Sequence, residues 1–394
     1  MKNILFVIDS LEVGGAEKSL ITLLNCLPKS QYNIDLLLIR NEGLFLKQLP
    51  QEVNRLTNIF PLQFLGISTS NIIFYLKKSP IYLLKKIIRY QLAKRNKKLS
   101  TNQSLWKLWK KDIKPLTKKY DTAISYLEGI PNYFVIDKVQ AKKKILWIHN
   151  EYTKLNYNKF FDTEYFNKAD KIVTISLLCK KCLVENFPCI PENKFEVLEN
   201  ISNTNYIKKL AESQINDPTF INRKGSILVS VGRLAKQKGY DIALESAFIL
   251  KEKGISFSWF IIGEGPLRNE LEQMSHNLGL ENYVHLIGIR SNPYPYIKQA
   301  DIIVQSSRYE GKSIVLDEAK ILQRPIISTN YDTVKDVINN NINGIITEMS
   351  AEALSSQIIK LINDVDLRNK LINNLKEEAI NNQSELYKYL HIID

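Results

Sequence analysis

Two glutamates in the stretch 302–329 (IIVQSSRYEGKSIVLDEAKILQRPIIST) have the types and spacing to bind a ligand rich in hydroxyl groups. A β-rich apolar run ends shortly before Glu310, and Glu318 follows inside an amphipathic helical pattern. In an open α/β sheet, ligands bind beyond the carboxyl ends of the strands, which is where Glu310 is expected. Carboxylates in the loop and about two turns into the helix could therefore hold one long ligand at two separate points.

Two cations follow another predicted strand, residues 227–231 (ILVSV). Arg233 and Lys238 leave the end of this strand together, and such a pair can neutralise a diphosphate. Arginine adds the ability to make bidentate contacts with phosphate oxygens. Either residue alone could be an ordinary surface charge.

The first half of the chain offers a glycine loop and a histidine. A predicted strand at 4–8 leads into Gly14 and Gly15, and a helical pattern follows to residue 27. A helix N-terminus after a strand can bind an anion, although a plain tight turn would also use glycine. His149 comes directly after the predicted strand 144–148, where it is either a site residue or an ordinary core or surface histidine.

Together these motifs resemble the retaining glycosyltransferases of family 4, which are GT-B enzymes of the glycosyltransferase group 1 type. The resemblance is carried by Glu310-x7-Glu318, by VGRL followed by Lys238-Gly239, by the GGAEK loop and by the IHN sequence at His149. It covers most of the second half of the chain and is thinner in the first half.

The resemblance implies a role for each residue. Glu318 would bind the ribose hydroxyls, Arg233 and Lys238 the diphosphate, and Glu310 the hydroxyls of the donor sugar, while His149 would face the sugar and the acceptor. The catalytic set is His149, Glu310, Arg233 and Lys238. The donor-binding set is Gly15, Arg233, Lys238, Gly263, Gly288, Glu310, Gly311, Lys312, Ser313 and Glu318, and the acceptor side is Gly14, Gly15 and His149.

Length and composition agree with two domains. The chain has 394 residues, more than one hydrophobic core usually supports, and its 44% apolar and 24% charged residues are those of a globular protein. We expect an α/β protein of the GT-B type, with two Rossmann-like domains whose parallel sheets face a central cleft. The predicted parts are an acceptor-side domain (1–200), a polar linker (201–224), a nucleotide-sugar domain (225–373) and, by resemblance, a helix (374–394) that crosses back to the first domain.

Metal and membrane-spanning segments are not expected. Cys179, Cys182 and Cys189 could suggest zinc, but no fourth ligand lies nearby in the sequence. Four cysteines in a chain of this length fit a reducing cytoplasm. The start of the sequence lacks a secretory apolar region, and no run approaches the ~20 apolar residues that span a bilayer.

The excess positive charge is concentrated in one segment. Of the net +13, Lys77–Lys119 contributes 15 lysines and arginines against one acid, Asp112. Across 72–119, aliphatic and aromatic residues alternate with the cations, which favours a helix lying on an anionic membrane surface. A solvated helix face and a nucleic-acid patch are the alternatives, and nucleic acid is the least favoured.

The sequence therefore predicts a retaining hexosyltransferase. The expected donor is a nucleotide sugar, UDP-linked by preference, with no metal or other cofactor. The expected acceptor is a lipid-linked glycan of capsule, O-antigen or exopolysaccharide assembly, at the cytoplasmic face of the plasma membrane. The alternatives are a nucleotide-sugar epimerase and a non-catalytic, membrane-associated partner subunit with the same fold.

Overall fold

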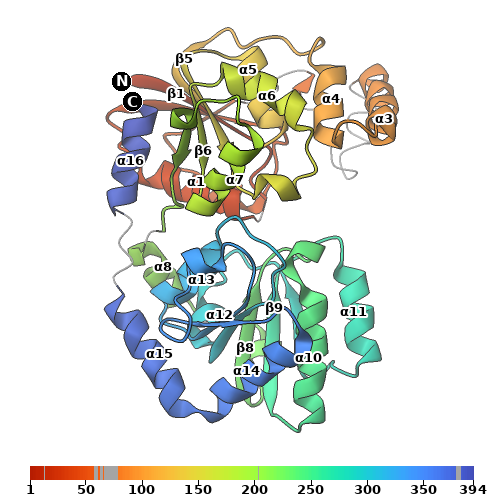
Figure 1. Ribbon diagram of the computed structural model, residues 1–394, viewed down its shortest axis with the longest axis vertical. Coiled ribbons are helices and arrows are strands. Elements are labelled where there is room, and N and C mark those ends of the chain that lie inside the picture. Colours follow the sequence, from red (N-terminus) through yellow and green to blue (C-terminus); the bar gives the residue numbers. More distant parts are fainter. Residues whose placement is uncertain (13, 57–60, 63–64, 66–78, 203, 379–382) are drawn as a thin grey trace. The chain divides into compact units, whose positions relative to one another are not determined.

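The computed structural model describes residues 1–12, 14–56, 61–62, 65, 79–202, 204–378 and 383–394. The chain divides into two compact units, Met1–Ile201 with Ser384–Asp394, and Ser202–Gln383. Each unit contains one parallel β-sheet with helices on both of its faces (Figure 1).

In the first unit, the described strands form a seven-stranded sheet in the order β3-β2-β1-β4-β5-β6-β7. The strands are β1 (Lys2–Ile8), β2 (Tyr32–Leu38), β3 (Asn54–Leu56), β4 (Lys119–Ser125), β5 (Gln140–Ile148), β6 (Lys171–Thr174) and β7 (Phe195–Val197). The helices are α1 (Gly15–Cys26), α3 (Pro80–Arg95), α4 (Thr101–Trp109), α5 (Ile130–Lys138), α6 (Lys159–Lys168), α7 (Leu177–Asn186) and α16 (Gln383–Ile393), with short 3₁₀ turns at Leu44–Gln48, Tyr152–Lys154 and Glu192–Lys194.

Strand β1 shows why the sheet is buried on both faces. Leu5 and Val7 pack into one apolar layer, and Ile4, Phe6 and Ile8 pack into the other, because successive side chains of a strand point to opposite faces. A continuous apolar run is the expected sequence of a parallel strand covered by helices on both sides.

In the second unit, the described strands form a six-stranded sheet in the order β10-β9-β8-β11-β12-β13. The strands are β8 (Ser226–Val231), β9 (Phe257–Ile262), β10 (Val284–Gly288), β11 (Ile302–Gln305), β12 (Ile326–Thr329) and β13 (Ile345–Thr347). The helices are α8 (Thr204–Ala211), α9 (Pro218–Ile221), α10 (Tyr240–Glu252), α11 (Arg268–Asn277), α12 (Tyr294–Gln299), α13 (Ile314–Ile321), α14 (Ala351–Asn363) and α15 (Val365–Glu377), with 3₁₀ turns at Lys236–Lys238 and Val334–Asp336. The prediction of two Rossmann-like α/β domains is confirmed.

Residues 201–224 do not form the open linker that their polar sequence predicts. They carry α8 and α9, whose Ile207, Ala211 and Phe220 are buried against the second sheet. Burial of these apolar side chains removes most of their surface from water, which favours docking of the segment. From Ser202 onward, the segment belongs to the second unit.

The last helix joins the first unit, but it begins later than residue 374. Residues 374–377 still lie in α15, and α16 starts at Gln383. Tyr389, Ile392 and Ile393 of α16 are buried in one apolar layer of the first sheet, and the two chain ends lie side by side (Figure 1). The backbone carbonyl of Ile393 accepts a hydrogen bond from Thr122 of β4 at 2.7 Å.

The basic segment is only partly an exposed amphipathic surface. Trp106 and Trp109 of α4 are completely buried in the core of the first unit, so the expectation that they belong to a surface helix is wrong. They lie inside because α4 packs against α3 and α5. Residues 72–78 of the predicted segment fall outside the described residues. Within the described part of the chain, no helix is long and apolar enough to cross a membrane.

Candidate functional site

Two loops meet at the carboxyl edge of the second sheet. Strands β8 and β11 are neighbours, so the loops that follow them come together although they are distant in sequence. Several hydrogen bonds join them. The backbone N–H of Arg308 donates to the carbonyl of Gln237 (2.7 Å), the Ser306 hydroxyl donates to the carbonyl of Lys238 (2.9 Å), and the guanidinium of Arg308 makes a two-pronged pair with Asp241 (2.8 and 2.6 Å). These hydrogen bonds join the two loops into one platform.

This platform brings Lys238 and Glu310 into direct contact. The Nζ of Lys238 lies 2.6 Å from Oε1 of Glu310, and the Ser307 hydroxyl donates to the same oxygen at 2.6 Å. The side chains of the ion pair are only 18% and 9% exposed. Thr333 holds the backbone of residue 310 by donating to its carbonyl at 2.9 Å. Sequence reasoning missed Ser307 and Thr333, because short hydroxyl side chains carry no motif of their own.

Arg233 provides a second cation at the same edge. It lies two residues beyond the end of β8 and is exposed, and within the described residues it makes no hydrogen bond or ion pair that would occupy its guanidinium. An arginine in this state can accept an anionic ligand without first breaking a contact. Arg233 and Lys238 therefore differ, since Lys238 is already paired with Glu310.

Glu318 lies deeper, on the buried side of α13, and is 1% exposed. Its Oε1 accepts a hydrogen bond from the Tyr294 hydroxyl at 3.2 Å. Burial and the neighbouring carboxylate of Glu318 raise the pKa of Tyr294, so this phenol stays protonated and remains a donor. Ser313, at the start of α13, donates to Oε1 of Gln305 at 2.7 Å and does not cap the helix with its side chain.

Gly263 and Gly288 shape the backbone beside this edge. Gly263 has φ +154°, and a Cβ there would overlap the carbonyl oxygen of Gly232, so the loops after β8 and β9 can approach only through glycine. Gly288 has φ +74°, a conformation that other residues adopt with strain. Gly311 and Lys312 lie between Glu310 and Ser313, in the loop before α13.

In the first unit, the glycine loop before α1 is occupied by a carboxylate of its own helix. The Glu17 side chain folds back over Gly14, where a Cβ would collide with it. Burial raises the pKa of Glu17 to about 7; a backbone hydrogen bond opposes this shift, and the charges of Asp9, Glu128 and Glu12 add to it. Carboxylates therefore surround the loop at Gly14 and Gly15, and the assignment of these glycines to the acceptor side stays a prediction.

His149 lies directly after β5 and is 7% exposed. Burial lowers the pKa of His149 to about 3, although a hydrogen bond with the backbone of Tyr126 opposes the shift. The imidazole is therefore neutral at physiological pH. Its ring packs at a tilt against Tyr126, with centroids 5.1 Å apart, and its Nε2 has no hydrogen-bond partner among the residues that the structure describes.

The predicted site residues thus fall into two groups. Gly14, Gly15 and His149 lie in the first unit, and the remaining residues lie at one edge of the second sheet. No group of three potential metal ligands occurs in the described part of the chain, and its four cysteines are free thiols.

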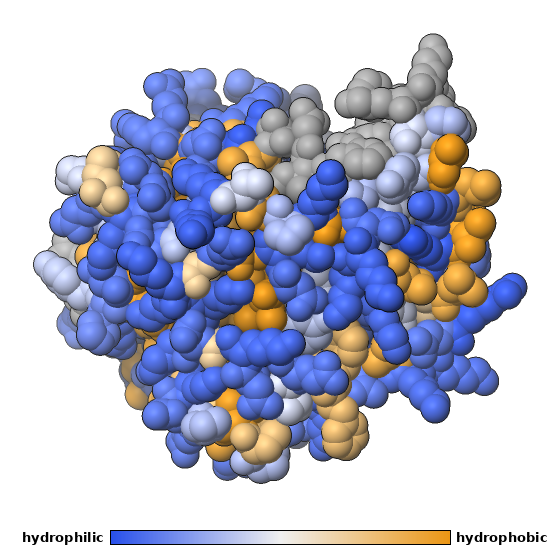
Figure 2. All heavy atoms as spheres, turned by 90° about the horizontal axis from the view of Figure 1, so that it is seen from above, coloured by the Kyte–Doolittle hydropathy of each residue, from blue (hydrophilic) through white to orange (hydrophobic). Residues whose placement is uncertain are grey.

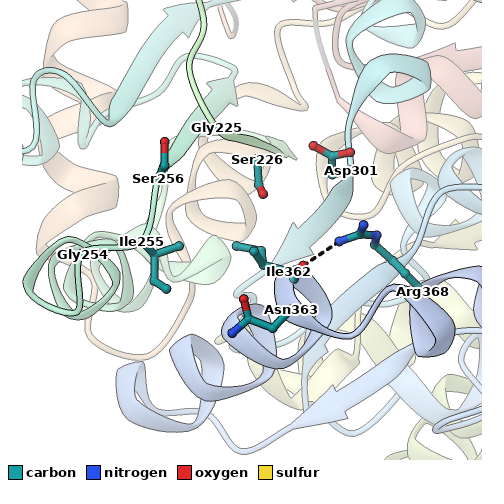
Figure 3. Close-up of a pocket in the computed structure, with 9 residues that line it drawn as sticks. All are labelled: Gly225, Ser226, Gly254, Ile255, Ser256, Asp301, Ile362, Asn363 and Arg368. Carbon is teal, nitrogen blue, oxygen red and sulfur yellow. Dashed lines mark hydrogen bonds between the residues drawn. The ribbon is translucent and has the colours of Figure 1, made fainter.

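A shallow pocket of about 450 Å³ lies elsewhere in the second unit, near the amino ends of β8, β9 and β11 (Figure 3). Its two charged side chains, Asp301 and Arg368, already have partners. Asp301 accepts from the backbone N–H of Ile227 at 2.8 Å, and Arg368 donates to the carbonyls of Leu361 and Ile362 at 2.8 and 3.0 Å. Since it is at the edge opposite to Glu310, this pocket is separate from the candidate site.

Solved structures share this two-unit architecture over the whole chain. Anabaena HepE in complex with UDP-glucose matches with a TM-score of 0.70 and 17% identity, covering 99% of this chain and 100% of that chain. A Staphylococcus aureus TarM structure that contains UDP matches with a TM-score of 0.69 and 16% identity, covering 100% of both chains. These likenesses define the class by fold, which is the GT-B fold of glycosyltransferases.

The sequence comparisons give a family match for part of the chain. Residues 212–378, most of the second unit, match the model of glycosyl transferases group 1. One curated relative is the N-acetylgalactosamine-N,N'-diacetylbacillosaminyl-diphospho-undecaprenol 4-alpha-N-acetylgalactosaminyltransferase of Campylobacter jejuni, 28% identical over 66% of this chain and 72% of that protein. Another is an uncharacterized glycosyltransferase of Methanocaldococcus jannaschii, 26% identical over 59% of this chain and 67% of that protein.

Proposed function

We propose that this chain is a retaining hexosyltransferase that takes its sugar from a UDP-linked donor and adds it to a lipid-linked glycan of a surface polysaccharide. The observation that carries the proposal is the set of charges at the carboxyl edge of the second sheet. A cation without a partner in the described structure (Arg233), a paired cation (Lys238) and two buried carboxylates (Glu310 and Glu318) lie beyond adjacent strands.

Each of these charged groups has a role in the proposed transfer reaction. When the bond from the anomeric carbon to the diphosphate breaks, negative charge develops on the leaving phosphate, and cations held in place stabilise it. Arg233 is available for this contact. Lys238 is paired with Glu310, so its ammonium would lie between the phosphate and the sugar hydroxyls that Glu310 would bind. Glu310 would accept hydrogen bonds from sugar hydroxyls with its remaining lone pairs, and Glu318 from the ribose.

The donor is tested by thermal stabilisation with UDP-, GDP-, ADP- and TDP-sugars and with the free nucleotides. A ligand at about 100 times its Kd stabilises the folded protein by ~2.7 kcal/mol, which is easily measured. We expect one nucleotide class to raise the melting temperature, and one sugar to raise it most. No shift with any of them would contradict the proposal.

The lipid-linked acceptor is supported by the exposed face of α3. Ile81, Leu84, Ile88 and Leu92 are 68%, 59%, 50% and 50% exposed, and their spacing places them on one side of the helix. Figure 2 shows apolar side chains at the right-hand margin of the molecule, on the side where α3 lies in Figure 1. The opposite side of α3 packs on the domain through Leu83 and Ala93.

This arrangement suits an anionic membrane surface. The exposed cations Lys94, Arg95, Lys97 and Lys98 follow the apolar face, and each cation near such a surface contributes about 1 kcal/mol. The apolar side chains add hydrophobic binding when they enter the headgroup region. The acceptor of the Campylobacter relative, by its name, is a diphospho-undecaprenol-linked sugar, which agrees with transfer at a membrane.

Co-sedimentation with vesicles that contain phosphatidylglycerol tests the membrane part. The double variant Leu84→Glu with Ile88→Glu is expected to lose most of the binding, because two charges replace the centre of the apolar face. Phe160→Glu is the matched control, since Phe160 is 78% exposed in the same unit but on α6. Equal binding by all three proteins, or no binding by the wild type at low salt, would contradict a membrane role for α3.

A further inference from the structure

Glu128 links the ends of two neighbouring strands in the first sheet. It follows β4, and its side chain reaches the turn after β5. Oε2 of Glu128 accepts the backbone N–H of His149 at 2.9 Å, and Oε1 accepts from the side-chain amide of Asn150 at 2.6 Å. The carboxylate thus continues the pairing of β4 with β5 beyond the point where their backbones stop pairing.

The free-energy penalty of burying the Glu128 carboxylate points to a function for this residue. Glu128 is 9% exposed, and it forms no ion pair within the described residues. A buried carboxylate without a cation is unfavourable, and two charge-assisted hydrogen bonds offset only part of that penalty. The next residue, Gly129, has φ +88°, a backbone conformation that glycine adopts without strain. Local rules of this kind are most often broken where a site requires it.

These contacts hold His149 in place. Its ring is packed against Tyr126, which itself stacks on Trp147 with centroids 4.8 Å apart, so the ring has little freedom to turn. Its backbone is held by Glu128. The Nε2 atom is the ring nitrogen with no hydrogen-bond partner in the described structure, and its position follows from where residue 149 is held.

We propose that Glu128 is a positioning residue. Through the N–H of His149 and the amide of Asn150, it fixes the turn that presents the imidazole to the sugar and acceptor. This inference rests on the proposed transfer reaction. It assigns Glu128 no contact with the substrate, so loss of its hydrogen bond with Asn150 should lower kcat and leave donor binding by the second unit unchanged.

An exchange of partners between Glu128 and Asn150 tests the inference. Asn150→Asp places two carboxylates against each other at a contact that is now 2.6 Å long. The turn should shift, and a displacement of about 1 Å can lower a rate by about 10²-fold. In the double variant Glu128→Gln with Asn150→Asp, the new amide donates to the new carboxylate and its oxygen still accepts from His149. We expect kcat to return to within about 5-fold of the wild type.

Three further readouts separate positioning from general damage. The KM for the donor should be unchanged in every variant, and the melting temperature of the double variant should match that of the wild type. The transfer rate of N150D should rise as the pH falls, because a proton shared by the two carboxyls restores the hydrogen bond. Glu128→Gln alone should be mild, since Asn150 can turn its amide to accept from the glutamine. If N150D does not fold, Asn150→Ala replaces it and should lower kcat about 5-fold, by loss of one anchoring bond.

Two results would overturn the inference. One is a wild-type kcat in N150D, or in Asn150→Ala where N150D does not fold. The other is no recovery of kcat in the double variant. Absence of any transfer by the wild-type protein is a different result: it would overturn the proposed function, and the role of Glu128 with it. Transfer by the wild type with a loss in N150D that the double variant repairs would support both.

Discussion

Replacement of Lys238 by methionine is expected to destabilise the second unit by about 3 kcal/mol. The structure sets this magnitude. The ammonium lies 2.6 Å from Glu310, and with side chains only 18% and 9% exposed the pair is poorly screened by solvent. Removal of one partner from a buried pair typically costs 3–5 kcal/mol, because the other charge stays buried. The lower end applies here, since the Ser307 hydroxyl still donates to Glu310.

A second variant makes the reasoning testable. When Lys238→Met is combined with Glu310→Gln, no uncompensated charge remains, and the free energy of unfolding should return to within about 1 kcal/mol of the wild type. Lys236→Met is the matched control, because Lys236 is an exposed lysine of the same turn, and it should change stability by less than about 0.5 kcal/mol.

The assay is urea denaturation read by hydrogen exchange of the peptides that contain β8 and β11. A chain of two units need not unfold in one step, and this readout reports the second unit alone. If Lys238→Met is as stable as the wild type, or if the double variant is no more stable than the single one, the ion pair does not stabilise the platform as argued. Neither variant is expected to bind the nucleotide sugar.

Three other predictions concern single residues. Arg233→Ala should lower the transfer rate about 10²–10³-fold, as loss of one transition-state contact commonly does, and a rate within tenfold of the wild type would refute its assignment. Burial lowers the pKa of His149 from 6.5 to about 3, so the imidazole takes up a proton on unfolding below about pH 6.5. The free energy of unfolding therefore decreases as the pH is lowered through this range, and the contribution of His149 is constant above about pH 7.5. Between pH 7.5 and 5.5 the wild type should lose about 1.4 kcal/mol more than His149→Gln in chemical denaturation, and equal losses would contradict a buried neutral imidazole. Tyr389→Ala removes a fully buried ring that stacks on Trp147, and calorimetry should show the first unit destabilised by about 3–5 kcal/mol; an unchanged transition would mean that α16 does not support the first sheet.

The fold class was predictable because parallel strands covered on both faces have a distinctive sequence. Runs such as residues 4–8 and 302–304 are apolar throughout, and helical patterns alternate with them. The position of Glu310 after a strand followed from the same pattern. The membership of residues 202–224 in the second unit was missed, because the apolar stripe of α8 (Ile207 and Ala211, four residues apart) spans only about two turns among polar residues.

The basic segment shows a second limit. The sequence indicates an amphipathic character but not which residues pack inward. The tryptophans of α4 are buried in the core, whereas Ile81, Leu84 and Ile88 of α3 face outward. This choice depends on which neighbouring helices offer a matching surface, and that information lies elsewhere in the chain.

The sequence alone determined the two α/β units and the residues at the ends of their strands, because strand pattern, turn residues and local order act over a few positions. The tertiary structure decided which of these residues touch. Lys238 meets Glu310 because β8 lies beside β11, and Glu128 holds His149 because β4 lies beside β5. Such pairings depend on the order of strands in the sheet, a property of the whole fold that no short stretch of sequence carries.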